Sequence, residues 1–423
     1  MSCVEHESYG AFARAIHARA ERTRTPIYAT LELTRRCNLR CAHCYNNLPA
    51  DHSSRHNELS TDEVRRLIDE MCEMGSLWLL ITGGEPLLRP DFLEIYSHAR
   101  RSGLVVTVFT NASLISEPLA DALAELPPFR VEVSIYGTCA ATHEVVTCVD
   151  GSYERTLRGV DRLRTRGLAV TLKTMALNVN RHEIWPLRAR VQNELAEEFR
   201  FDGFVNGRLD GATTRPLTLR LPPEGVVALD LLDPRRTRDW TRLFDRYLGA
   251  STPAGGGKLY ECAAGLTSLS IDPYGGLRPC ALSNGPAYDL RHGRLHEGWF
   301  GFLADLRSTT LRRATKCVSC ALRPLCGMCP AHAELEHGDP EEPVEHLCET
   351  AHIRAVVLGY QVPNHGDCAY CPGGALHSRT KDKARALLRR DSLGHNEEPP
   401  QHDVGSTAGR GEETPSETDE EWA

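Results

Sequence analysis

Short apolar runs alternate with amphipathic stretches through the first half of the chain. Runs with the length and residue types of buried strands are IYATLEL (27–33), LWLLI (77–81), LVVTVFT (104–110), FRVEVSI (129–135), LAVTLKTM (168–175) and EFRFD (198–202). Helical patterns occupy residues 8–22, 60–71, 90–101, 116–126, 153–166 and 181–191. Repeated strand–helix order predicts parallel strands joined by right-handed crossovers. About six such units predict an α/β fold, a partial (β/α)6 barrel of the TIM type.

Polar residues and cysteines gather at the carboxyl ends of these predicted strands, the edge where barrels of this kind bind ligands. The candidates are Cys37, Cys41, Cys44, Gly83, Gly84, Glu85, Asn111 and Ser134. We therefore expect one site at the barrel mouth. Lys173 in the fifth strand is a weaker candidate, because a lysine at a strand end is more often solvated.

The spacing of Cys37, Cys41 and Cys44 predicts an iron–sulfur cluster with one open iron. The stretch ELTRRCNLRCAHCYN places three thiols on one short loop in a C-x3-C-x2-C pattern. Clusters that only carry electrons usually have four cysteine ligands, so three ligands leave one iron of a [4Fe–4S] cube free to bind a small molecule. A zinc site is the alternative, but zinc favours four ligands and paired C-x2-C spacing.

The triplet and the following TGGEP resemble the motifs of the radical SAM superfamily. The resemblance implies that the three cysteines hold the catalytic [4Fe–4S] cluster and that His43 lies beside the adenine of S-adenosylmethionine. It implies further cofactor contacts by Gly83, Gly84, Glu85, Asn111 and Ser134, with Glu85 receiving the methionine amino group. Glycines there permit close approach of the backbone to a ligand.

Two positions depart from the pattern of the family. Tyr136 stands where many relatives carry Asp, so part of the ribose contact is left unassigned. Cys148 stands where Gly is usual, and we expect a small packed residue there.

Seven further cysteines follow Tyr260 in an order that resembles the SPASM extension of radical SAM enzymes, which houses two auxiliary [4Fe–4S] clusters. The resemblance implies an outer cluster held by Cys317, Cys320, Cys326 and Cys348, and an inner cluster held by Cys262, Cys280 and Cys329. The gap between Cys326 and Cys329 is two residues, where the commonest pattern has three. A single zinc site with spare thiols is the alternative.

Cys368 and Cys371 form a C-x2-C pair outside this pattern. One of them could complete the inner cluster, or the pair could bind a separate metal, act as a redox pair, or consist of ordinary surface thiols. Because the inner set has three cysteines, we carry the first interpretation as a hypothesis. Cys3, Cys72 and Cys139 are expected to have no ligand role.

Composition narrows the class of protein. The net charge of −8 arises from the acidic end, because residues 391–423 hold ten Asp or Glu and one Arg, which leaves about +1 for the rest. A nearly neutral body gives no basis for nucleic-acid binding.

The chain has no run of about 18 apolar residues and no apolar signal core, so we expect a cytoplasmic protein without membrane contact. Sixteen cysteines in that compartment indicate metal ligands rather than disulfides.

These patterns divide the chain into five parts. We expect a helical extension at 1–26, the partial barrel at 27–205, a turn-rich connector with two short helices at 206–258, the cysteine-rich SPASM domain at 259–372, and a basic then acidic disordered tail at 373–423.

The resemblance implies an oxidoreductase that uses S-adenosylmethionine to make a 5′-deoxyadenosyl radical and abstracts hydrogen from a peptide or protein substrate. Auxiliary clusters suit oxidation or crosslink formation during maturation of a ribosomal peptide. Expected partners are an electron donor such as flavodoxin or ferredoxin and a separate leader-binding protein. The alternatives are cofactor biosynthesis, of a modified haem or a peptide-derived quinone, and an iron–sulfur electron carrier without enzymatic activity.

Overall fold

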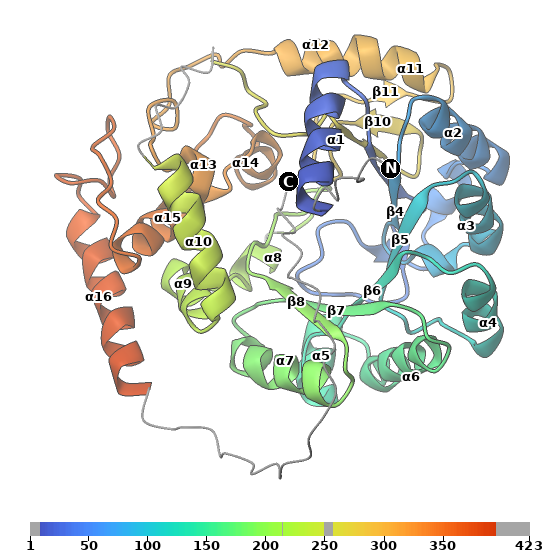
Figure 1. Cartoon of the computed structure of the whole chain (residues 1–423), viewed down its shortest axis with the longest axis horizontal. Coiled ribbons are helices and arrows are strands. Elements are labelled where there is room, and N and C mark those ends of the chain that lie inside the picture. The colour runs from blue at the N-terminus through green and yellow to red at the C-terminus, as the bar shows by residue number, and fades with distance from the viewer. Residues whose placement is uncertain (1–8, 214, 249–256, 395–423) are drawn as a thin grey trace, which may run out of the picture.

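A curved sheet with helices on its outer face forms the body of the protein (Figure 1). The computed structural model describes residues 9–213, 215–248 and 257–394. The six strands expected from the apolar runs are all present, and they pair in parallel in chain order. They are β1 (Tyr28–Glu32), β4 (Trp78–Thr82), β5 (Val105–Thr110), β6 (Arg130–Ser134), β7 (Val170–Met175) and β8 (Glu198–Asp202). The predicted partial barrel is therefore confirmed.

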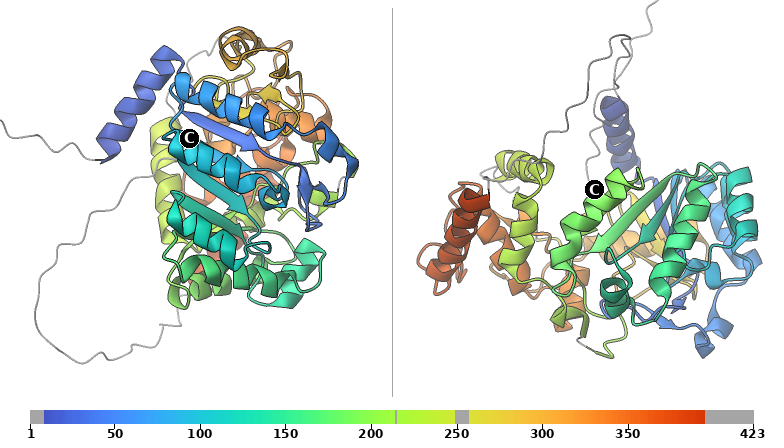
Figure 2. Two further views of the ribbon diagram at one scale, coloured as in Figure 1. Left: turned by 90° about the vertical axis from the view of Figure 1, so that its right-hand side faces the viewer. Right: turned by 90° about the horizontal axis from the view of Figure 1, so that it is seen from below.

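Amphipathic helices connect these strands and cover their outer face (Figure 2). They are α2 (Thr61–Glu73), α3 (Phe92–Arg101), α4 (Glu117–Glu125), α5 (Ala140–Thr147), α6 (Ser152–Arg164) and α7 (Ile184–Asn193). Helix α2 begins at Ser60, whose hydroxyl accepts from the Glu63 N–H while the Glu63 carboxylate accepts from the Ser60 N–H. This capping box satisfies two backbone donors at the helix start.

Burial alternates along the central strands. In β5, the even-numbered positions from Val106 to Thr110 are buried and the odd-numbered ones are half-buried. Because successive side chains of a strand point to opposite faces, one face packs against the helices and the other lines the barrel interior. Val106 and Val108 belong to the largest core cluster, together with Leu67 and Ile68 of α2. Complete burial of a side chain of this size contributes roughly 1.5–3 kcal/mol.

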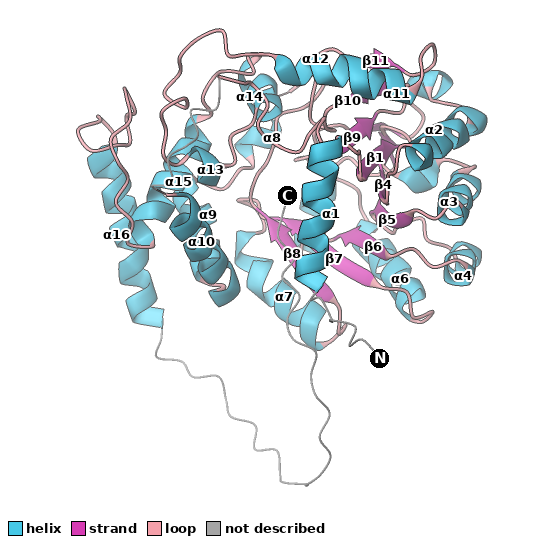
Figure 3. Ribbon diagram, turned by 45° about the horizontal axis from the view of Figure 1, so that its top comes forward, coloured by secondary structure: helices cyan, strands magenta, loops and turns pink. Residues whose placement is uncertain are grey.

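The cysteine-rich region begins by extending the same sheet. Strand β9 (Ser268–Ile271) pairs in parallel with β1, and β10 (Gly276–Arg278) and β11 (Tyr288–Asp289) follow antiparallel. Trp299 and Leu303 belong to the barrel's own core cluster. The predicted boundary at residue 259 therefore does not separate two cores, because the sheet and its core continue across it (Figure 3).

Short helices make up most of the remaining structure. The connector forms α8 (Arg215–Thr218), α9 (Pro223–Leu231) and α10 (Pro234–Tyr247). The cysteine-rich region forms α11 (Leu295–Glu297), a π-helical turn (Gly298–Phe302), α12 (Leu303–Ser308), α13 (Arg323–Cys326), α14 (Pro330–His337) and α15 (Glu345–Val357). Helix α15 packs against α9, so the connector and the cysteine-rich region share an interface.

Both ends of the described chain are helical. Helix α1 (Tyr9–Thr23) agrees with the helical pattern at 8–22, and His17 lies 2.9 Å from the hydroxyl of Tyr28 at the start of β1. At the other end, the expected disordered tail is wrong for its basic part, because α16 (His377–Gly394) packs against α15 and α9. Ala384 of α16 is buried beside Ile353 of α15, which supplies the apolar contact that stabilises this helix. The acidic end at 395–423 lies outside the described residues.

Within the described part of the chain, no helix combines the length and the apolar character needed to cross a bilayer.

Candidate functional site

The loop that carries the cysteine triplet leaves β1 and folds against the end of β4. The Gly84 N–H donates to the carbonyl oxygen of Thr34 at 2.7 Å, and the Glu85 N–H donates to that of Arg36 at 2.8 Å. A Cβ atom on Gly83 would lie 2.1 Å from the Thr34 carbonyl oxygen, and one on Gly84 would lie 2.3 Å from that of Arg36. Both positions therefore require glycine, because the backbone of the cysteine loop packs directly against them. The motif alone did not indicate this contact.

The loop brings Cys37, Cys41 and Cys44 together at the carboxyl edge of the barrel. Cys37 is buried, and the other two are half-buried. Burial, then the neighbouring Cys44 and Cys37, raises the pKa of Cys41 well above its usual value. Burial, then Glu85, raises the pKa of Cys37 to about 12. Clustered thiols of this kind ionise when a cation binds them, so the donor set fits a metal cluster.

Glu85 connects the ends of two strands. Its side chain is fully buried, and its carboxylate accepts from the Thr110 hydroxyl at 2.7 Å and from the Asn111 N–H at 2.8 Å. Burial raises the pKa of Glu85 to about 7, although these hydrogen bonds act in the opposite direction. The contact of Glu85 with the methionine amino group stays a prediction. In the structure, the hydrogen bonds of this carboxylate connect the end of β4 to the end of β5.

Asn111 extends this connection to the cysteine loop. Its Nδ2 atom donates to the Asn38 Oδ1 atom at 3.0 Å and lies 3.8 Å from the Cys37 sulfur. Its Oδ1 atom accepts from the N–H and hydroxyl of Ser113. Asn111 therefore orients the first thiol of the triplet from the end of the neighbouring strand.

His43 and Ser134 meet through Tyr136. The rings of His43 and Tyr136 lie edge to face with their centroids 4.9 Å apart, and the Tyr136 side chain lies beside those of Ser134 and Cys41. Burial lowers the pKa of His43 to about 4, so the ring is neutral near pH 7. Its Nδ1 atom is buried without a hydrogen-bond partner. A buried polar atom normally has a partner, so this arrangement fits a polar ligand beside the cysteines.

Glu32 is a site residue that the sequence analysis missed. It ends β1 inside the barrel, with 1% of its surface exposed, and its Oε1 atom accepts from Asn46 at 2.9 Å and from Tyr45 at 3.3 Å. Its Oε2 atom accepts no hydrogen bond. Burial, the largest influence, raises its pKa to about 7. The available signal was a carboxylate within an apolar strand that leads into the cysteine motif.

Lys173 is not the solvated strand-end residue that we expected. Its ammonium lies 3.3 Å from the Glu132 carboxylate and 2.7 Å from the ring centroid of Phe109. Burial lowers the pKa of Lys173 to about 7, against the attraction of Glu132. The barrel interior therefore contains a half-buried ion pair close to Ser134, the register partner of Lys173 on the neighbouring strand.

Cys148 also differs from its expected role. It is exposed rather than packed, and its φ angle of 54° places it in the left-handed region at the end of α5. Glycine adopts that conformation without strain, which explains why a glycine suits this position.

The seven cysteines of the second array form the two groups that the resemblance implies. Cys317, Cys320, Cys326 and Cys348 line one cavity. Cys280 lies close enough to Cys329 and Cys262 for their charges to raise its pKa, which burial and these neighbours bring to about 11. Burial also raises the pKa of Cys326 and Cys348 in the first group and of Cys329 in the second, and such donors fit metal clusters for the reason given for the cysteine triplet.

The hypothesis that Cys368 or Cys371 completes the inner group is wrong. Cys368 lines the cavity of the outer group, and both sulfurs lie within 4.8 Å of nitrogen atoms of His352 and His365. The segment 365–371 follows α15, which carries Cys348, and that connection places the pair at the outer group.

Comparison with known proteins agrees with this geometry. Residues 31–191 match the family model described as Radical SAM superfamily. The AdoMet-dependent heme synthase of Methanosarcina barkeri is 36% identical over 166 residues, which cover 38% of this chain and 46% of the relative. The PqqA peptide cyclase of Xanthomonas euvesicatoria is 26% identical over 349 residues, which cover 78% of this chain and 90% of the relative.

Solved structures share the fold over a longer span. Streptococcus suis SuiB bound to precursor peptide SuiA has a TM-score of 0.61 at 16% identity, covering 82% of this chain and 83% of SuiB. Native anSMEcpe with bound AdoMet has a TM-score of 0.57 at 14% identity, covering 85% of this chain and 100% of that one. The chain spans less than half the length of the first curated relatives that it matches.

Proposed function

We propose that this chain is a radical S-adenosylmethionine enzyme that modifies a peptide or protein substrate. The observation that carries the proposal is the convergence of Cys37, Cys41 and Cys44 at the barrel mouth, with two further cysteine groups in the region that begins by extending the same sheet. The long alignment with a PqqA peptide cyclase and the fold shared with peptide-bound SuiB support a peptide as the substrate class.

The chain's own residues prepare the site in three ways. The three thiols would hold the catalytic cluster, and Asn111 orients Cys37. The neutral ring of His43 and the buried carboxylate of Glu32 each offer S-adenosylmethionine a polar atom that has no hydrogen-bond partner, Nδ1 and Oε2. Phe109 and Tyr136 line the interior with aromatic surface, which helps to exclude water. When bound, the cofactors supply a 5′-deoxyadenosyl radical for hydrogen abstraction, and the auxiliary clusters supply electron transfer.

Cofactor biosynthesis is the second candidate. The observation that favours it is the higher identity of the chain to heme synthases and to an Fe-coproporphyrin III synthase, 34–37% over 141–166 residues. These alignments cover 33–38% of this chain, whereas the alignment with the PqqA peptide cyclase of Xanthomonas euvesicatoria covers 78%. We therefore place a peptide first. A reduced flavodoxin or ferredoxin and a separate leader-binding protein are the partners that this function would require.

One experiment separates the two candidates. The protein with its clusters reconstituted is incubated without oxygen with dithionite and S-adenosylmethionine, and with either a short peptide encoded beside its gene or iron coproporphyrin III. Mass spectrometry then follows each compound. We expect the peptide to lose hydrogen atoms, or to take up deuterium if it epimerises in D2O, while the porphyrin is unchanged. Decarboxylation of the porphyrin with no change in the peptide would contradict the proposal.

A further inference from the structure

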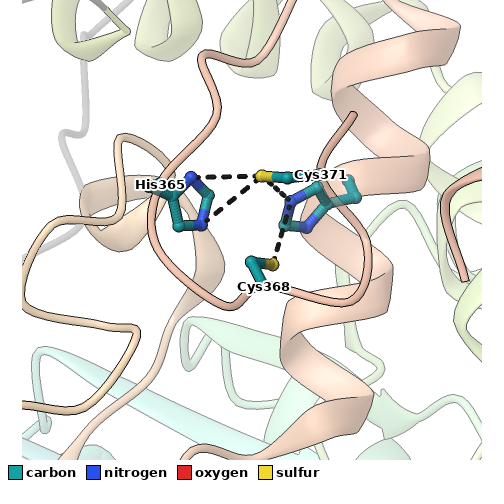
Figure 4. A group of neighbouring side chains, drawn as sticks. His365, Cys368 and Cys371 are labelled. Carbon is teal, nitrogen blue, oxygen red and sulfur yellow. Dashed lines mark hydrogen bonds between the residues drawn. The ribbon is translucent and has the colours of Figure 1, made fainter. Parts of the chain in front are cut away.

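Four buried side chains beside the outer cysteine group converge on one point. They are His352 on α15, His365 in the following loop, and Cys368 and Cys371 before α16 (Figure 4). Each has at most 5% of its surface exposed. Their ligand atoms all lie within 4.8 Å of one another. Two thiols and two imidazoles are a donor set that binds zinc in structural sites.

The distances match the edges of a coordination tetrahedron. The Cys371 sulfur lies 3.5 Å from His352 Nε2 and 3.2 Å from His365 Nδ1, and the Cys368 sulfur lies 3.7 Å from His352 Nε2. A zinc ion with Zn–S bonds of about 2.3 Å and Zn–N bonds of about 2.0–2.1 Å gives sulfur-to-nitrogen edges of about 3.6 Å. The atoms are therefore already spaced for one ion.

A hydrogen bond to the main chain already fixes the orientation of the His352 ring. Its Nδ1 atom donates to the carbonyl oxygen of Cys348 at 2.7 Å. This hydrogen bond leaves Nε2 as the unprotonated nitrogen that faces the two sulfurs. Ligating histidines commonly donate their second N–H to a carbonyl or carboxylate, which sets the ring orientation. Here the orienting carbonyl belongs to a cysteine of the outer group.

A single ion fits these residues better than a share in the outer cluster does. A cube attaches each thiolate to a different iron, so its ligand sulfurs are spread around the cluster, whereas these four donors meet within one ion's reach. The outer group has its own four cysteines, and the cavity that they line also borders His352, His365 and Cys368. The two donor sets are therefore neighbours, each with four ligands of its own.

We propose that His352, His365, Cys368 and Cys371 bind one Zn²⁺ ion. Both thiols lose their protons when the ion binds, as in other thiolate–zinc sites. The ion ties the segment 365–371 to α15 and thereby fastens α16 next to the outer cluster. This function is structural and independent of the radical chemistry proposed above.

The test measures metal content in the full-length protein purified without oxygen. We expect one zinc per chain in addition to the cluster iron. The variant Cys368→Ser/Cys371→Ser should lose that zinc and keep its iron, and the matched control Cys139→Ser should keep both. Loss of iron in place of zinc, or unchanged zinc in the double variant, would overturn the proposal.

X-ray absorption at the zinc edge of the unaltered protein gives an answer that does not depend on folding of the variant. The proposal predicts two sulfur ligands at about 2.3 Å and two nitrogen ligands at about 2.0–2.1 Å. Absence of zinc, or a shell of four sulfurs, would rule it out. Because neither measurement uses S-adenosylmethionine, failure here is distinct from failure of the proposed function.

Discussion

Gly84 lies so close to Arg36 that a Cβ atom on the glycine would be 2.3 Å from the arginine carbonyl oxygen. The φ angle of Gly84 lies outside the left-handed region, so the requirement comes from space and not from backbone conformation. The obstructing atom belongs to the backbone of the cysteine loop. A side chain here would therefore push away the loop that carries the first cluster.

The variant Gly84→Ala tests this relationship. We expect a loss of roughly 1–3 kcal/mol in the free energy of unfolding, because the new methyl group overpacks a tight backbone contact. Iron bound at the first site should fall at the same time. The matched control is Gly301→Ala, since a Cβ at Gly301 meets no atom within 4 Å. Equal iron content and equal unfolding curves for the two variants would contradict this account.

His143 gives a prediction about pH. It is fully buried, and its Nδ1 atom accepts from the Tyr136 N–H at 3.2 Å. Burial lowers its pKa from 6.5 to about 4. The unfolded chain therefore binds a proton between these pH values that the folded chain does not, so stability falls as pH decreases below 6.5. Between pH 6.5 and 5 the loss is about 2 kcal/mol.

The comparison variant is His143→Gln, which keeps a hydrogen-bond acceptor and cannot titrate in this range. Thermal unfolding of both proteins from pH 7.5 to 5 measures the effect. The unaltered protein should lose stability more steeply than the variant. Parallel curves would show that His143 does not carry this pH dependence.

Arg354 of α15 connects the cysteine-rich region to the connector. Its guanidinium donates to Asp230 at 2.7 and 3.0 Å and lies 3.7 Å from the ring centroid of Trp240. The variant Arg354→Met leaves the buried Asp230 with Arg236 as its remaining partner. We expect a cost of about 3 kcal/mol in chemical denaturation. Exposed Arg385→Met on α16 is the control and should change stability by less than about 0.5 kcal/mol.

The outer group should serve substrate turnover and not formation of the radical. The variant Cys326→Ala removes one of its four sulfurs, while the barrel residues around the first cysteine set are unaffected. We expect continued formation of 5′-deoxyadenosine and loss of modified peptide. Circular dichroism must first show that the variant is folded, because metal binding contributes to the stability of small metal domains. Normal product from a folded variant without the outer cluster would exclude this role.

The six barrel strands could be predicted because the signal for each is local. An apolar run followed by an amphipathic helix identifies a βα unit without knowledge of its neighbours. Strand β9 could not be found in this way, because Ser268–Ile271 is short and pairs with Tyr28–Leu31 far away in sequence. Helix α16 was not predicted to be ordered, because its sequence is mostly polar. Its burial depends on Ala384, which lies in the same core cluster as Ile353 of α15.

The three cysteine sets could be predicted from spacing, since each motif lies within a loop or follows a known order. The roles of individual residues could not. The contact of Glu85 with the cofactor stays a prediction, and the motif did not indicate that its carboxylate accepts hydrogen bonds from the Thr110 hydroxyl and the Asn111 N–H. His352 and His365 lie on different elements, so their meeting with the C-x2-C pair depends on the path of the chain after α15.

The most direct test of the central claim is the formation of 5′-deoxyadenosine by the reconstituted protein under dithionite. The unaltered protein and the control Cys139→Ala, whose cysteine is exposed and outside all three sets, should cleave S-adenosylmethionine and release this product. The variant Cys37→Ala/Cys41→Ala/Cys44→Ala should form none and should lack the iron of one cluster. Undiminished 5′-deoxyadenosine from the triple variant would contradict the assignment of these cysteines to the catalytic cluster.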